Sequence, residues 1–314
     1  MRCAAIDLGT NSARLLIGDR VSDSLSTIRI DREIVRLGGG FTDESGLSDI
    51  AQRRSLDCLK RFSGIIKEYG VQRICASATS AVRDAVNGSC FVERVLKETG
   101  IKLAVIDGEL EGRLTLKGVI SGLDLIHDSV VVVDVGGGST EFTIAEHGEI
   151  VHVVSLPLGV VRLSEGFGEP EAMSERINFI LKDLHSGISS SGVSINPDSV
   201  MIATAGTATT LAAIKIEMVE YDYRKVNNFQ MSRTEIAEIF ERLLPLTPRE
   251  LTLVPGLEKG REDLIIAGIL IILQSMDSLG FTRLKISDYG LLEGLALSDD
   301  ALFQGNILPD TFMP

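Results

Sequence analysis

The sequence contains no tryptophan, and aromatic residues of all kinds make up only 5% of its 314 residues. It also lacks an excess of basic residues, since its formal net charge is −13 at pH 7. A protein that neutralises many nucleic-acid phosphates usually presents a basic surface, so this balance argues against nonspecific nucleic-acid binding. Any polyanionic ligand must therefore be bound by a local group of cations and by backbone amides.

Cysteines are few, and none stands in a C-x-x-C pair or beside a histidine pattern: they are Cys3, Cys58, Cys75 and Cys90. This spacing argues against a zinc or redox site and is typical of free, buried thiols in a reducing cytosol. The longest apolar run, from Leu264 to Leu273, is much shorter than the about 20 residues that cross a bilayer. The N-terminus shows no basic segment and no cleavage site. We expect a cytoplasmic protein with neither nucleic acid nor membrane among its partners.

One short motif occurs twice, as DLGTNS from Asp7 to Ser12 and as DVGGGST from Asp134 to Thr140. In each copy, an acidic residue stands at the end of an apolar run, and glycine and small hydroxyl or amide residues come soon after it. Such a turn offers backbone N–H groups to an anion, because glycine has no Cβ to block the approach. The copies stand 127 positions apart, about the size of one domain. We expect a duplicated α/β chain that grips phosphates in a cleft between its halves.

Hydrophobic periodicity predicts alternating strands and helices in both halves. The expected strands are 3–8, 12–18, 26–37, 71–77 and 101–106, then 129–135, 141–146, 150–156, 199–205 and 283–287. The expected helices are 48–69, 91–99, 109–121, 174–186, 233–243, 261–276 and 291–297, with one more after a small-residue loop at 206–210. We place the domain boundary on architecture alone, giving domains 1–127 and 128–314, with the last helix able to pack back on the first domain.

Five segments, in this order, resemble the exopolyphosphatase and guanosine pentaphosphate phosphatase (Ppx/GppA) family. They are AIDLGTNSARLLI at 5–17, ATSAVR at 78–83, GELEGR at 108–113, DVGGGSTE at 134–141 and GTATTL at 206–211. The resemblance spans nearly the whole chain. It implies two ribonuclease-H-like domains, the fold of actin, sugar kinases and chaperone ATPases, with hydrolysis of a phosphate chain in the interdomain cleft.

Each demand of phosphoanhydride hydrolysis has candidate residues in the chain. The carboxylates Asp134, Glu141 and Asp7 lie beside the two turns and are the expected ligands of Mg²⁺ or another divalent cation. For Asp7 and Asp134 the alternative is capping of the turn by the side chain. The residues expected to bind substrate phosphates are Gly9, Thr10, Asn11, Ser12, Arg14, Gly136, Gly137, Gly138, Ser139, Thr140, Gly206 and Thr207. The 206–210 loop also suits plain strand-to-helix packing.

Arg83 is expected to contact phosphates through its planar guanidinium, with a solvated surface arginine as the alternative. Glu111 matches the catalytic glutamate of the family and is our candidate for the general base that activates water. Glu109 should project from a different side of the same helix. The plainer interpretation is that both acids only favour a helix N-terminus.

The chain departs from the family pattern at three positions: Leu110 replaces an acid, Gly112 replaces alanine and Leu292 replaces an arginine. These changes bear on the electrostatic field at Glu111 and on contacts with long substrates.

The most concrete hypothesis is an exopolyphosphatase that releases terminal orthophosphate from inorganic polyphosphate. Its nearest alternative is a 5′-phosphohydrolase of guanosine pentaphosphate (pppGpp). Two further classes are a kinase of the same superfold and a non-catalytic sensor that binds polyphosphate or the alarmone. The sequence shows no motif for an acceptor-substrate pocket, and Glu111 argues against the sensor. Chain-length preference and a homodimer are left open.

Overall fold

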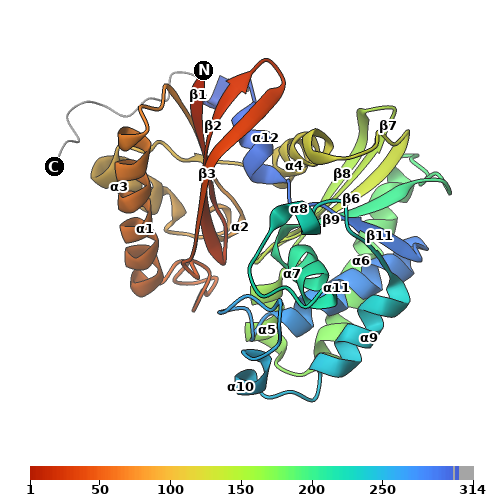
Figure 1. Cartoon of the computed structure of the whole chain (residues 1–314). Coiled ribbons are helices and arrows are strands. Elements are labelled where there is room, and N and C mark those ends of the chain that lie inside the picture. The colour runs from red at the N-terminus through yellow and green to blue at the C-terminus, as the bar shows by residue number, and fades with distance from the viewer. Residues whose placement is uncertain (300, 304–314) are drawn as a thin grey trace. The chain divides into compact units, whose positions relative to one another are not determined.

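A computed structural model of the chain describes residues 1–299 and 301–303. It forms two compact units, the first comprising Met1–Ser121 together with the chain from Leu291 onward, and the second comprising Gly122–Gly290 (Figure 1). The sequence-based ranges 1–127 and 128–314 differ from these units at both junctions. In particular, the helix that begins at Leu291 contacts the sheet of the first unit.

The strands of the first unit form one five-stranded sheet within the described residues, in the order β3-β2-β1-β4-β5. β1 pairs antiparallel with β2 and parallel with β4, and β2 pairs antiparallel with β3. The strands are β1 (Arg2–Leu8), β2 (Ser12–Val21), β3 (Ser24–Ile34), β4 (Arg73–Ala78) and β5 (Ala104–Val105). The expected strands at 3–8, 12–18 and 71–77 are therefore confirmed, while the one expected at 101–106 is shorter than its apolar run.

Helices cover both faces of this sheet, with α1 and α3 on one side and α4 and α12 on the other (Figure 1). They are α1 (Asp49–Glu68), α2 (Ser80–Arg83), α3 (Gly88–Thr99), α4 (Gly108–Gly122) and α12 (Leu291–Leu297), with a 3₁₀ turn at Ala301–Phe303. Ser48, the first residue of the helix expected at 48–69, caps α1 by accepting from the Ala51 N–H. The chain leaves the α1 helix at Gly70, which has a φ of +60°. Ile50, in the first turn of α1, is 72% exposed.

The strands of the second unit form a six-stranded sheet within the described residues, in the order β10-β11-β9-β6-β7-β8. They are β6 (Ser129–Val135), β7 (Thr140–Glu146), β8 (Glu149–Leu156), β9 (Val200–Thr204), β10 (Gln230–Ser232) and β11 (Arg283–Ile286). All residues of β6 are buried, as expected for a valine-rich central strand that is covered on both faces.

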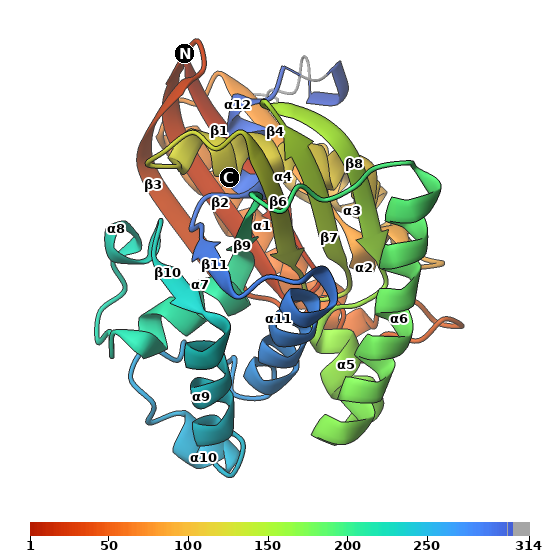
Figure 2. The same ribbon diagram turned by 90° about the vertical axis from the view of Figure 1, so that its right-hand side faces the viewer.

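The helices of the second unit enclose its core with β6, β7 and β9, and Figure 2 shows α11 between α6 and α9. They are α5 (Val160–Phe167), α6 (Pro170–Ser190), α7 (Ala205–Lys215), α8 (Tyr223–Val226), α9 (Arg233–Leu243), α10 (Pro248–Leu251) and α11 (Ile265–Leu279). Two local expectations were wrong. The helix expected at 174–186 extends from Pro170 to Ser190, and the 206–210 segment, expected as a loop, is helical from Ala205 onward because its small residues pack in the core.

Both sheets repeat one plan. The order β3-β2-β1-β4-β5 in the first unit matches β8-β7-β6-β9-β11 in the second, with the same antiparallel and parallel pairings around the central strand. The duplicated α/β fold predicted from the repeated motif is therefore confirmed. Within the described residues, no helix combines the length and the apolar character needed to cross a membrane.

Cys3, Cys58 and Cys75 are buried and Cys90 is exposed, so the expectation of four buried thiols fails at Cys90. Burial raises the pKa of the Cys75 thiol to about 11 and that of Cys58 to about 12. We expect one fast-reacting thiol in the native protein, because only a thiolate attacks a disulfide reagent. Absorbance after addition of 5,5′-dithiobis(2-nitrobenzoate) measures this count, and Cys90→Ser should abolish the fast phase. Four equivalents should react in guanidinium, whereas two or more fast equivalents in the native state would contradict the described packing.

Candidate active site

The turn between β1 and β2 is closed by the Gly9 N–H, which donates to the Ser12 carbonyl at 3.0 Å. The Thr10 carbonyl accepts from the Gly38 N–H at 2.8 Å, and the Asn11 carbonyl accepts from Val35 and Arg36. A trans peptide points its N–H opposite to its carbonyl, so the N–H groups of Asn11 and Ser12 point away from the 35–38 segment. They remain available to an anion.

The side chain of Asn11 supports this interpretation of the turn. The residue is only 7% exposed, and neither its Oδ1 nor its Nδ2 has a hydrogen-bond partner among the described residues. Buried polar groups in folded proteins are almost always satisfied, so this amide indicates a ligand that completes the site.

The turn between β6 and β7 has the same geometry. The Gly136 N–H donates to the Ser139 carbonyl at 3.0 Å, which is the bond seen in the first hairpin. The carbonyls of Gly136 and Gly137 accept from Val160 and Val161 at the start of α5, and the Gly138 carbonyl accepts from Arg162 Nε at 3.1 Å. The N–H groups of residues 137, 138 and 139 therefore point away from α5, as in a backbone anion site.

The charged residues that flank the two turns differ between the units. Asp7 stands opposite Arg14 on the neighbouring strand, whereas Asp134 stands opposite Glu141 in the equivalent register. Glu141 is 1% exposed and accepts a hydrogen bond of 2.7 Å from the Ser155 hydroxyl. The first hairpin thus pairs an acidic residue with an arginine, and the second pairs two acidic residues.

Arg83 and Glu111 lie together in the first unit, although 28 residues separate them in the chain. Arg83 Nη1 donates to the Ile106 carbonyl at 3.0 Å and to Glu111 Oε2 at 3.3 Å. The Glu111 side chain is 9% exposed and that of Arg83 is 24% exposed. A solvated surface arginine would be more exposed than Arg83 is. The Ile106 carbonyl also helps to hold the guanidinium beside Glu111.

The N-terminus of α4 is capped by Asp107, whose carboxylate accepts from the Leu110 N–H at 2.8 Å. Glu111 is therefore not required as a cap. Glu109 forms an exposed ion pair with Arg113 at 2.8 Å, on another side of the helix. The expected difference between the two glutamates is confirmed.

The first turn is also linked to α2. Thr10 Oγ1 and Ser80 Oγ are 2.9 Å apart, and both residues are buried. Because Arg83 ends α2, this bond joins the Gly9–Ser12 turn to the element that carries the arginine. The structure thus brings Thr10, Asn11, Arg83 and Glu111 into connected elements of one unit.

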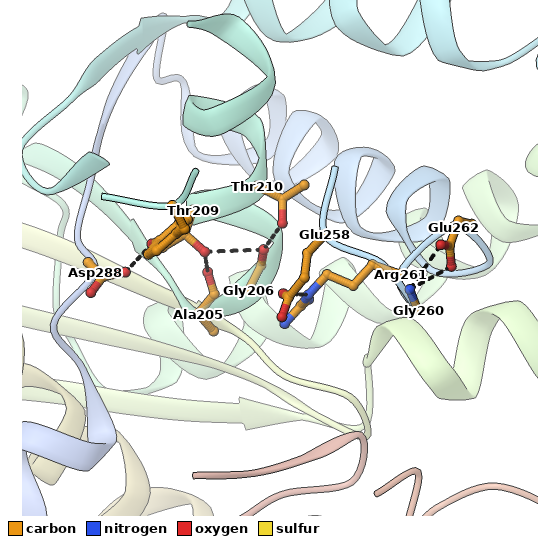
Figure 3. A network of polar contacts seen from close by, with 10 residues as sticks. Ala205, Gly206, Thr209, Thr210, Glu258, Gly260, Arg261, Glu262 and Asp288 are labelled. Atoms are coloured by element: carbon orange, nitrogen blue, oxygen red, sulfur yellow. Dashed lines mark hydrogen bonds and ion pairs between the residues drawn. The ribbon is translucent and has the colours of Figure 1, made fainter. Parts of the chain in front are cut away.

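Three predicted phosphate-binding residues have other roles in the structure. The Thr140 hydroxyl donates to the Leu158 carbonyl, and the residue is fully buried. Thr207 is 3% exposed and packs against Gly268 of α11, where a Cβ would meet its Oγ1. Gly206 lies beneath the guanidinium of Arg261, which in turn donates to Glu258 at 2.8 Å (Figure 3). These contacts give the three residues a packing role in the second unit, and their phosphate contacts stay a prediction.

The acidic pair Asp134 and Glu141 is suited to a divalent cation, since Mg²⁺ commonly takes one or two carboxylates together with phosphate oxygens. Within the part of the chain that is described, no three His, Cys, Asp or Glu side chains gather as a ready-made metal site. Asp7, the third expected ligand, belongs to the first unit and stands opposite Arg14.

Sequence reasoning missed Ser80 and Asp107. Asp107 had a local signal, since an aspartate just before a helical pattern is a common N-cap. Ser80 had none, because its partner Thr10 is 70 residues away. Of the three departures from the family pattern, Leu292 is fully buried beside Ala5 and Leu16, and Leu110 packs at the edge of the same cluster. Gly112 is also buried.

The model of the Ppx/GppA phosphatase family matches residues 16–302. The chain belongs to this family. Residues 16–302 include Arg83, Glu111 and the second hairpin, so these features lie within the matched part of the Ppx/GppA sequence pattern.

Several Ppx/GppA relatives have names that describe phosphate chemistry. A bifunctional 3-dehydroquinate synthase/phosphatase from Fusobacterium nucleatum is 33% identical over 94% of this chain, which spans 46% of that protein's length. Exopolyphosphatase 2 from Mycobacterium tuberculosis is 30% identical over 95% of this chain and 98% of its own. A guanosine-5′-triphosphate,3′-diphosphate pyrophosphatase from Pseudoalteromonas translucida is 28% identical over 94% of this chain and 58% of its own.

Solved structures of Ppx/GppA proteins share the fold. The Aquifex aeolicus family member superposes with a TM-score of 0.79 at 32% identity, covering 95% of this chain and 97% of that one. An exopolyphosphatase from Cytophaga hutchinsonii has a TM-score of 0.84 at 29% identity, covering 94% and 96%. The duplicated ribonuclease-H-like architecture implied by the sequence resemblance is therefore that of the family.

Gly159 allows the start of α5 to approach the second turn, since a Cβ there would lie 2.3 Å from the Gly137 carbonyl oxygen. We expect Gly159→Ala to lower the free energy of unfolding by about 1–3 kcal/mol, the usual cost of overpacking. Chemical denaturation measures the change.

Gly166→Ala in the same helix is the matched control, because a Cβ at that position meets nothing within 4 Å. It should leave stability unchanged or raise it by up to about 1 kcal/mol through helix propensity. Equal stability of the two variants would show that α5 does not press against the turn as described.

Proposed function

We propose that this chain is a divalent-cation-dependent exopolyphosphatase that releases terminal orthophosphate from inorganic polyphosphate. The observation that carries the proposal is the partly buried contact of 3.3 Å between Arg83 Nη1 and Glu111 Oε2, with Arg83 on the helix that is hydrogen-bonded to the Gly9–Ser12 turn. A relative whose length this chain matches almost fully is named as an exopolyphosphatase. Phosphatases of this family generally depend on a divalent cation.

Glu111 would accept a proton from the attacking water. The water oxygen forms a bond to the terminal phosphorus, while the bond from that phosphorus to the bridging oxygen breaks. The products are orthophosphate and a chain that is one phosphate shorter. The N-cap at Asp107 and the contact with Arg83 hold the Glu111 carboxylate in one position, as a general base requires.

Arg83 would neutralise charge on the transferring phosphoryl group. Its Nη1 is engaged by Ile106 and Glu111, and its planar guanidinium offers further N–H donors in a fixed fork. Asn11 and the outward N–H groups of the first turn would orient phosphate oxygens. The equivalent N–H groups of the second turn, at residues 137–139, would do the same.

Asp134 and Glu141 would hold Mg²⁺, with Ser155 fixing the orientation of the Glu141 carboxylate. Bound there, the ion would supply charge neutralisation at phosphate oxygens. Asp7 stays a predicted ligand, although its cross-strand partner is an arginine.

Hydrolysis of pppGpp is the second candidate, because several relatives that match most of this chain are named as pyrophosphatases of that nucleotide. Both substrates present a terminal phosphoanhydride to the same groups. A purely sensory role would leave the buried Glu111 without a chemical task.

Replacing Glu111 with glutamine tests the assignment of the base. The amide cannot take up the proton, so we expect kcat for phosphate release from polyphosphate to fall about a hundredfold or more. Initial rates with excess Mg²⁺, measured as released orthophosphate, give the comparison.

Glu109→Gln provides the matched control, because it makes the same chemical change two residues away on an exposed side of α4. It should keep wild-type turnover. Near-wild-type turnover by Glu111→Gln would exclude this residue as the base, and wild-type protein that binds polyphosphate or pppGpp without releasing phosphate would favour the sensor.

A further inference from the structure

The segment of residues 35–39, here called the backing segment, holds the first turn from behind. Its first two N–H groups donate to the Asn11 carbonyl at 3.0 and 2.8 Å, and the Gly38 N–H donates to the Thr10 carbonyl at 2.8 Å. These bonds fix the planes of two successive peptides, and a trans peptide carries its N–H opposite to its carbonyl. The outward direction of the N–H groups of the turn therefore depends on where the backing segment lies.

The backbone of the backing segment is strained. Arg36 has a φ of +45°, in the left-handed region that residues other than glycine rarely adopt. Its carbonyl accepts from the Gly39 N–H at 3.0 Å, which closes a bend over residues 36–39. A conformation of this kind persists only where contacts from the surroundings hold it. The segment therefore needs support from another element if it is to hold the turn.

Arg54 of α1 supplies such support. Its Nε donates to the Val35 carbonyl at 2.5 Å, and its Nη2 donates to the Arg36 carbonyl at 2.9 Å. The guanidinium thus spans two consecutive peptides, which its planar fork of N–H donors allows. Hydrogen bonds with a charged donor are stronger than those between neutral groups. The side chain of Arg54 is therefore a clamp on the strained part of the backing segment.

The N-terminus of α1 holds the same segment at a second point. Ser48, which caps the helix, donates its hydroxyl to the Gly39 carbonyl at 3.2 Å. The helix is itself fixed, since Leu56 and Phe62 of its buried face belong to the core of the first unit. Arg54 therefore connects a helix that is packed in the core to the segment behind the turn.

The second turn is supported in another way. The N–H groups of Val160 and Val161, at the start of α5, donate to the carbonyls of Gly136 and Gly137. These donors belong to a helix, whose own hydrogen bonds fix its backbone. The donors behind the first turn lie outside any helix or strand. The first turn thus depends on side-chain clamps such as Arg54 for an order that the second obtains from helical structure.

We propose that Arg54 is a positioning residue of the first turn, which holds the backing segment so that the N–H groups of the turn keep their outward direction. The inference rests on the proposed function in one respect, because it takes the first turn to bind phosphate oxygens. Arg54 acts through the backbone of the backing segment, and its replacement removes neither Glu111 nor Arg83. Its loss should therefore weaken the use of substrate while the reacting groups stay present.

The test compares the steady-state hydrolysis of tripolyphosphate by wild-type protein and Arg54→Gln, with excess Mg²⁺ and well below the unfolding temperature of each. Glutamine has one amide donor group and cannot bind two carbonyls as a fork. We expect kcat/KM to fall about tenfold, the size of effect that one charge-assisted hydrogen bond produces. Arg54→Lys should restore part of the loss, because it keeps the charge as a single point donor. The lysine variant also serves if the glutamine variant does not fold.

Arg53→Gln is the matched control. Arg53 is the preceding residue of α1 and is exposed, and its side chain forms no hydrogen bond or ion pair with any residue that the structure describes. The control makes the same chemical change and should keep the wild-type kcat/KM. Equal values of kcat/KM for the Arg53 and Arg54 variants would overturn the proposal.

Hydrogen exchange of single amides, followed by NMR, separates positioning from general loosening of the fold. In Arg54→Gln the N–H groups of Val35, Arg36 and Gly38 should exchange faster, because their bonds to the turn open more often. The core amides of α1, such as that of Leu59, should keep their wild-type rates. Faster exchange throughout α1, or unchanged exchange in the backing segment, would overturn the positioning role.

The failure of the proposed function would be visible separately. If wild-type protein released no phosphate, equilibrium binding of tripolyphosphate to wild-type and Arg54→Gln protein would decide the role of Arg54. Weaker binding by the variant supports the proposal, and equal binding overturns it. A wild-type protein that bound no tripolyphosphate would overturn it as well, because the first turn would then not be a phosphate site.

Discussion

One hydrogen bond, made twice, underlies the rest of this structure. In each unit the glycine after the central strand donates its N–H to a serine carbonyl three residues later, at 3.0 Å. That bond closes the turn, and N–H groups of the segment behind it donate to the turn's carbonyls. The remaining N–H groups point outward, where they can contact phosphate oxygens. Gly159 lies against the second turn, and a charged pair of residues flanks each turn on the neighbouring strands.

The two copies share a backbone but differ in charge. Across the first turn an aspartate stands opposite an arginine, and across the second an aspartate stands opposite a glutamate. This difference suggests a division of labour, in which the first unit contacts the phosphate chain through arginines and the second holds a cation. Phosphoryl transfer needs both forms of charge neutralisation. A duplicated fold can supply both forms of neutralisation because the residues that flank the turn can differ between the copies while the turn itself is kept.

Much of the fold was predictable because its signals are local. The alternation of apolar runs with small-residue turns marked β1, β2, β6 and β7, and Ser48 marked the start of α1. Sequence motifs were sufficient to single out Arg83 and Glu111 as candidate site residues. Their contact was not, because it depends on tertiary packing and on the Ile106 carbonyl. The contact between Thr207 and Gly268 was not predictable either, because a small hydroxyl residue in a glycine motif gives no sign of the helix it packs against.

The division of labour is tested most directly by measuring Mn²⁺ binding, through the electron paramagnetic resonance signal of the free ion, in wild-type protein and two variants. Asp134→Asn and Asp7→Asn make the same change at equivalent positions of the two turns. The account predicts that Asp134→Asn loses Mn²⁺ binding and that Asp7→Asn weakens it much less, because Asp7 stands opposite Arg14. Loss of binding in Asp7→Asn with retention in Asp134→Asn would contradict it.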